Sequence, residues 1–76
     1  MEYILVDIKM EKNRVVELKV PGKITAIELI EMLVTIYNLD SNKIKSLHAE
    51  PLGRILGADE ILIEAGVNNG SQISLL

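Results

Sequence analysis

The strongest constraint on the fold of this chain is an alternation of apolar side chains that fills most of its first twenty residues. Alternate residues of the stretch 3–10 form an apolar set, and the stretch 14–20 repeats the pattern. A period of two predicts a β-strand with one buried face. The polar residues 11–13 between them include an asparagine, which tolerates a left-handed turn. The sequence therefore opens on a predicted β-hairpin, with inward residues Ile4, Val6, Ile8, Met10, Val16, Leu18 and Val20.

The hydrophobic period changes after this hairpin. Pro21 and Gly22 end the second strand, because proline cannot donate to a ladder and glycine permits a sharp change of direction. Thr25 and Glu28 have the spacing of a capping box, in which each side chain accepts from the other residue's amide. Asn38 is suited to the left-handed position that ends a helix. Between the caps runs a helical apolar stripe, centred on Ala26, Ile30, Leu33 and Tyr37.

Two residues widen the apolar face of this predicted helix beyond what packing on a sheet requires. They are Met32 and Ile36. We expect the segment 39–44 to cover them, with Ile44 as the lid. A dimer contact is the alternative.

The next signals are shorter. Residues 45–49 and 54–56 predict two brief strands, joined by a turn over 50–53. Asp59 is expected to cap a single helical turn over 60–65.

The end of the chain predicts one more strand. Gly66 ends the short helix, and residues 68–70 turn the chain into a strand in which Ile73 and Leu75 face inward. Because this strand needs a partner, we expect it beside the first strand, in the middle of the sheet.

These elements define the predicted fold class. The order β-β-α-β-β-(short helix)-β indicates an α+β fold in which a mixed sheet of four to five strands packs on one helix. With 76 residues, most of the apolar side chains must serve one core, so we predict a single domain over residues 1–76.

Composition argues against several classes of function. The chain has no cysteine, one histidine and no convergent pair of carboxylates, so we predict no catalytic site, no metal site and no cofactor. Its eleven acidic and eight basic residues are scattered and give a net charge of -3, and only two residues are aromatic, so nucleic acid is not an expected partner. The N-terminal stretch has neither a signal peptide pattern nor an apolar run long enough to insert in a membrane. A cytoplasmic location is therefore expected.

A family resemblance rests on three features. They are the element order, the passage "VPGKITAIELIEML", and the closing pattern that places Leu62, Val67, Ser71, Ile73 and Leu75 at fixed intervals. Together they resemble ubiquitin and the β-grasp fold over essentially the whole chain. Within that superfamily the chain is similar to the YukD/EsaB group, the small cytoplasmic ubiquitin-like proteins of bacterial type VII (WXG100) secretion systems.

The resemblance implies an adaptor and not a conjugated modifier. Conjugated ubiquitins and related sulfur carriers act through a flexible tail that ends in Gly-Gly, and this sequence ends on Leu75 and Leu76. We therefore expect a non-conjugated protein that binds cytoplasmic, membrane or ATPase components of the secretion system. The alternatives are a ubiquitin-like interaction domain from a larger protein, and a carrier or modifier whose diglycine tail is missing from this sequence.

The candidate partner-binding residues lie on the predicted outward face of the sheet. His48 points outward if Leu47 points inward. Tyr3, Leu5 and Leu76 share or border the same face if the first and last strands are adjacent, and together form a modest apolar spot. The competing interpretation is that single outward apolar residues, and one surface histidine, are simply solvated.

Overall fold

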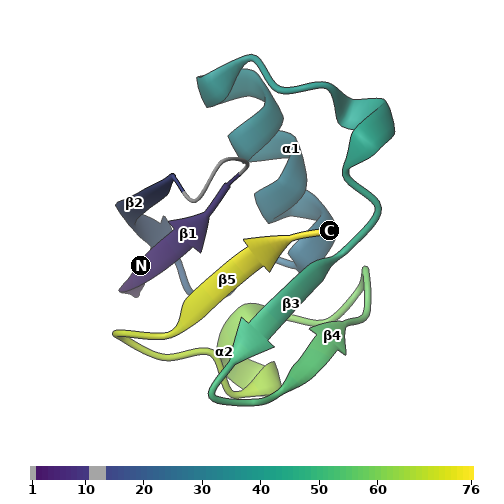
Figure 1. Cartoon of the computed structure of the whole chain (residues 1–76). Helices are drawn as coiled ribbons and strands as arrows, with labels where there is room; N and C mark the ends of the chain where they lie inside the picture. The colour runs from purple at the N-terminus through teal and green to yellow at the C-terminus, as the bar shows by residue number, and fades with distance from the viewer. Residues whose placement is uncertain (1, 11–13) are drawn as a thin grey trace.

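The computed structural model describes residues 2–10 and 14–76, so the turn predicted at 11–13 lies outside the described residues. The predicted order of elements is confirmed. Figure 1 shows the chain path from the first hairpin to the last strand. The elements are β1 (Tyr3–Lys9), β2 (Val15–Pro21), α1 (Ala26–Tyr37), β3 (Leu47–Glu50), β4 (Arg54–Leu56), α2 (Leu62–Ala65) and β5 (Gln72–Leu75). One turn of 3-10 helix over Ser41–Lys43, which was not predicted, lies between α1 and β3.

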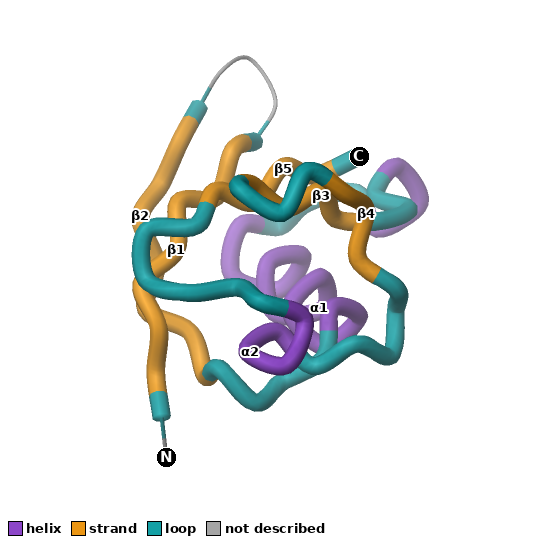
Figure 2. Tube along the Cα trace, turned by 90° about the horizontal axis from the view of Figure 1, so that it is seen from below, coloured by secondary structure: helices purple, strands orange, loops and turns teal. Residues whose placement is uncertain are grey.

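The strands form one mixed sheet with the order β2-β1-β5-β3-β4. β5 runs parallel to β1 and antiparallel to β3, so the last strand occupies the middle of the sheet as predicted. α1 covers one face of the sheet, and the other face is left open (Figure 2). The core between sheet and helix is aliphatic, and its fully buried large side chains are Val6, Ile8, Val20, Leu29, Leu33, Leu47, Leu62, Val67 and Ile73.

The start of α1 is held by local and tertiary contacts together. The predicted capping box is present, because Thr25 Oγ1 accepts from the Glu28 amide at 3.3 Å and Glu28 Oε1 accepts from the Thr25 amide at 2.9 Å. The first two helical amides, those of Ala26 and Ile27, donate to backbone carbonyls of the loop that precedes α2. Four orphan amides begin any α-helix, so this loop completes a cap that the threonine starts.

The prediction that Asp59 caps α2 is wrong. The helix begins at Leu62, its N-cap is Ile61, and no side chain caps it. The amides of Leu62 and Ile63 donate instead to carbonyls of Ile24 and Gly22 in the segment that leads into α1. Because tertiary contacts already satisfy these amides, a capping side chain is not needed.

The covering of α1 also differs from the prediction. Ile36 is 57% exposed, and Met32 is only half-buried. Ile36 and Met32 line a shallow hollow on α1, whereas Ile44 lines a separate hollow with Leu39 and Leu75. The segment 39–44 therefore packs at the end of the sheet and leaves Ile36 open to solvent.

Candidate functional site

The outward face of the sheet is the surface on which the predicted binding residues lie. Tyr3 and Leu5 on β1 alternate with buried Ile4 and Val6, so both point away from α1. His48 on β3 alternates with buried Leu47 and Ala49 in the same way. The predicted residues thus share one face, and the pairing of the strands decides which of them are neighbours.

His48, Ile55 and Leu76 form one group, which we call the apolar patch. His48 pairs directly with Ile55 on β4 and with Ser74 on β5. Leu76 lies two residues beyond Ser74, so by the register it is a diagonal neighbour of His48 at roughly 7–8 Å between side chains. Ile55 is 54% exposed and Leu76 is 48% exposed.

The position of Leu76 in this patch is fixed by its backbone. Its amide donates to the carbonyl of Ser46 at 3.0 Å, and its carbonyl accepts from the amide of Lys45 at 2.8 Å. These bonds hold the backbone of Leu76 beside the segment before β3, beyond Leu75, the last residue of β5. Leu76 therefore borders both the apolar patch and the hollow at the end of the sheet.

Tyr3 and Leu5 lie elsewhere on the same face. Asp7 pairs with Gln72 between the parallel strands β1 and β5. Leu5 comes two residues before this pair along β1, and Leu76 comes four residues after it, just beyond the end of β5. At the usual rise of a strand the two leucines are separated by about 20 Å along the strand direction. The single apolar spot predicted from Tyr3, Leu5 and Leu76 is thus two separate places.

An acidic row crosses the sheet between these two places. Glu17 pairs with Asp7, Asp7 with Gln72, and Gln72 with Glu50. Like charges directly opposite each other on two strands are unfavourable. Glu50 also reaches the imidazole of His48, with 3.7 Å between Oε1 and Nδ1. A partner of this face would meet an apolar patch beside a row of carboxylates.

Sequence reasoning missed Ile55 as a member of this site. The signal was available, because a strand over 54–56 that buries Leu56 must turn Ile55 outward. What the sequence did not supply was the pairing of Ile55 with His48, which depends on the register of a hairpin only a few residues long.

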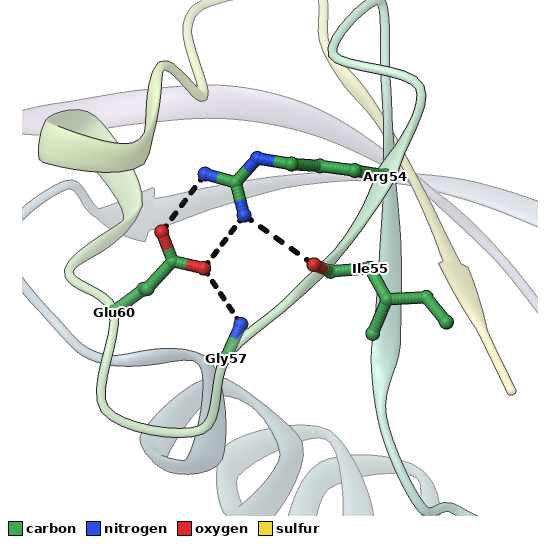
Figure 3. A network of polar contacts seen from close by, with 4 residues as sticks. All are labelled: Arg54, Ile55, Gly57 and Glu60. Carbon is green, nitrogen blue, oxygen red and sulfur yellow. Dashed lines mark hydrogen bonds and ion pairs between the residues drawn. The ribbon is translucent and has the colours of Figure 1, made fainter.

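A network of polar contacts joins β4 to the loop that follows it (Figure 3). The guanidinium of Arg54 donates to both carboxylate oxygens of Glu60, at 2.7 and 2.8 Å, and the Gly57 amide donates to Glu60 Oε1 at 2.7 Å. These bonds lower the pKa of Glu60 to about 2, with the Arg54 hydrogen bonds as the largest cause. The same pair raises the pKa of Arg54. The network holds β4, and Ile55 with it, against the loop that caps α1.

Side chains suited to metal binding are not gathered in the residues 2–10 and 14–76. No group of three potential metal-ligating side chains occurs among them. In the same residues no helix has the length and apolar character needed to cross a membrane. The hollow that Ile44 lines has a volume of about 470 Å³ and lies at the end of the sheet. Its lining residues are Met10, Arg14, Asn38, Leu39, Asp40, Lys43, Ile44, Leu75 and Leu76.

Comparisons with known proteins agree with this architecture. The family described as "WXG100 protein secretion system (Wss), protein YukD" matches residues 3–75. No curated protein sequence matches the chain.

Solved structures of ubiquitin-like domains are also similar. The N-terminal ubiquitin-like domain of the 4931431F19Rik protein has a TM-score of 0.81 at 18% identity, over 97% of this chain and 73% of that one. The ubiquitin-like domain of an Arabidopsis thaliana protein has a TM-score of 0.80 at 21% identity, over 100% and 78%. Caldiarchaeum subterraneum ubiquitin has a TM-score of 0.76 at 20% identity, over 97% and 91%. At these identities the structures show a ubiquitin-like fold and nothing more specific.

Proposed function

The chain belongs to the YukD family of the WXG100 protein secretion system, and from this premise we propose that it is a non-conjugated adaptor that binds a cytoplasmic component of such a system. The partner we propose is a membrane or ATPase component of a bacterial secretion apparatus, contacted from the cytoplasm. No catalytic step is part of the proposal, because the chain offers one histidine and no cysteine.

The observation that carries the proposal is the apolar patch. Ile55 and Leu76 are each about half exposed, and both flank His48 on strands whose register is fixed. A preformed group of apolar side chains on rigid strands needs little ordering when a partner binds, so more of its burial is available as affinity. The adjoining acidic row favours a partner that carries lysine or arginine next to the apolar residue it inserts.

The non-conjugated part of the proposal concerns the segment around Leu76. Two backbone hydrogen bonds tie Leu76 to Lys45 and Ser46, and we propose that this segment stays on the sheet and takes no part in a coupling reaction. We expect no ATP–pyrophosphate exchange with an E1-type activating enzyme, and clear exchange would contradict this part of the proposal.

The binding site can be tested with a matched pair of variants. Ile55→Asp places a charge in the apolar patch, whereas Ile27→Asp places the same charge at a similarly exposed position on α1. We expect purified cytoplasmic domains of the secretion components to bind wild type and Ile27→Asp alike in calorimetry, and Ile55→Asp at least about tenfold more weakly. Circular dichroism and urea unfolding would confirm that both variants fold. Equal affinity of Ile55→Asp and wild type would remove the apolar patch from consideration.

A further inference from the structure

The outer edge of β2 presents a row of unpaired backbone groups. The amides of Leu5 and Asp7 donate toward the β5 side of β1, to Asn69 Oδ1 and the Ser71 carbonyl. The amide of Met10 donates to Arg14 instead, so the even residues of β1 are the ones that bond to β2. Hydrogen-bonded and non-bonded pairs alternate in an antiparallel ladder. In the register of this hairpin the even residues of β2 therefore face β1, and the odd ones face away.

Three residues of β2 thus direct both an N–H and a C=O outward, namely Val15, Glu17 and Lys19. β2 is the first strand of the sheet order, and in the part of the chain that the structure describes no strand lies beyond it. Edges of this kind are usually blocked by a bulge, a proline or charged side chains, lysine above all. β2 carries charges of both signs on this edge, at Glu17 and Lys19. The register between β1 and β2 runs without interruption from Tyr3–Pro21 to Lys9–Val15, and Pro21 lies only at the last position.

The charges on this edge are self-complementary. We propose that β2 pairs antiparallel with β2 of a second copy of this chain, about a two-fold axis that passes through Leu18. In this register each Glu17 lies opposite Lys19 of the second copy, and the two residues exchange N–H···O=C bonds. Each Val15 amide donates to the Pro21 carbonyl of the other copy, whereas the reciprocal bond to the Val15 carbonyl is missing because proline has no amide hydrogen. The sheets of the two copies become continuous.

Two further features of β2 favour this register. Glu17 lies opposite Asp7 on β1, an unfavourable like-charge pair, and the proposed pairing places a lysine on its other side. Leu18 and Val16 face the helix side of the sheet yet remain partly exposed, and the axis through Leu18 brings the two copies of that side chain together. A register centred on Glu17 would instead oppose two carboxylates, so charge complementarity selects the register centred on Leu18.

The pairing leaves the apolar patch free. The patch lies on β3, β4 and the end of β5, whereas β2 is at the opposite edge of the sheet. A dimer would therefore present two patches, and two linked sites bind a partner that carries two copies of the target more tightly than one site does. We expect the contact of two strand edges to bury less than roughly 1,200 Å², the lower end of standard interfaces, and therefore to belong to the weak, transient class.

The experiment is sedimentation equilibrium from about 10 μM to 1 mM, on wild type and three charge variants. Glu17→Lys and Lys19→Glu each put like charges opposite one another, and each should weaken the dimer about tenfold or more. The double variant that carries both changes restores opposite pairs and should dimerise like wild type. Circular dichroism confirms folding of all four proteins. A wild-type chain that is monomeric at 1 mM overturns the proposal, and so does a double variant no stronger than the single ones.

Hydrogen exchange on the same samples locates the contact. On dimerisation the amides of Val15, Glu17 and Lys19 should gain protection, while those of Val16, Leu18 and Val20 are already protected by β1. Protection that appears elsewhere would place the dimer on another surface and refute the β2 edge. If the three amides gain protection only when a secretion component is added to a monomeric chain, a strand from that component is the occupant and the second copy is excluded.

Discussion

The position of β5 in the middle of the sheet can be tested by shortening one side chain. Ile73 has no exposed surface and lies between Ile8 on β1 and Ala49 on β3. Replacing it with alanine removes three carbon atoms from a site that both neighbours and α1 enclose. At about 0.8 kcal/mol per buried methylene, the transfer of these atoms amounts to about 2.4 kcal/mol. The cavity left behind raises the expected loss of stability to about 3–4 kcal/mol.

Urea unfolding followed by circular dichroism measures this loss. A chain of this size is expected to have a slope near 1 kcal/mol per M of urea, so the midpoint should fall by about 3 M. The matched control is Ile55→Ala, which removes the same atoms from a side chain that is more than half exposed. We expect the control to cost less than about 1 kcal/mol. If Ile73→Ala cost no more than Ile55→Ala, β5 would not be the enclosed central strand, and the argument for a fixed Leu76 would fail with it.

Three other predictions follow from local geometry. Glu60 has a folded pKa of about 2, below its usual value of 4.5, so it stabilises the fold above about pH 4.5 and loses this effect as pH falls toward 2. Urea midpoints of wild type should therefore exceed those of Glu60→Gln at pH 7, and the two should converge by pH 2; a gap that widened on acidification would contradict this. Gly66→Ala should lose about 1–2 kcal/mol in thermal or urea unfolding, because φ is 104° and a Cβ would lie 2.9 Å from Leu52 Cδ2; an unchanged midpoint would show that the turn adapts. Thr25→Ala should cost about 1 kcal/mol as the loss of a true N-cap, whereas Asp59→Ala should stay within about 0.5 kcal/mol, and the reverse order would restore Asp59 as the cap of α2.

The arrangement of the outward face explains why the site was only partly predictable. The outward orientation of His48 was predicted correctly, because side chains alternate along a strand and the preceding residue, Leu47, is buried. Its neighbours Ile55 and Leu76 come from two different strands, and their closeness depends on the registers of two ladders. The face on which a side chain lies follows from the alternation in the local sequence. The register between strands follows from how the turns and the core fit together. The roles of Tyr3, Leu5, His48 and Leu76 in binding a partner remain predictions.

Gly22 also shows the difference between what the local sequence predicts and what distant contacts decide. The sequence predicted that this glycine is needed for a sharp change of direction. It has no positive φ, and a Cβ there would lie 2.5 Å from Ile63 Cγ2, so the glycine is needed for the close approach of α2. No local pattern indicates which distant side chain will lie against a given position.

The sequence alone determined the element order, the capping box at Thr25, the left-handed end of α1 at Asn38 and the inward faces of the strands. These follow from side-chain periodicity and from hydrogen bonds between residues only a few positions apart. Tertiary structure alone decided that the loop before α2 completes the cap of α1, that Ile36 stays exposed, and that the outward apolar residues divide into two places. Each of these depends on which distant segments come into contact when the core packs. The packing energy of the core depends on all of these segments together, so no local stretch of sequence specifies it.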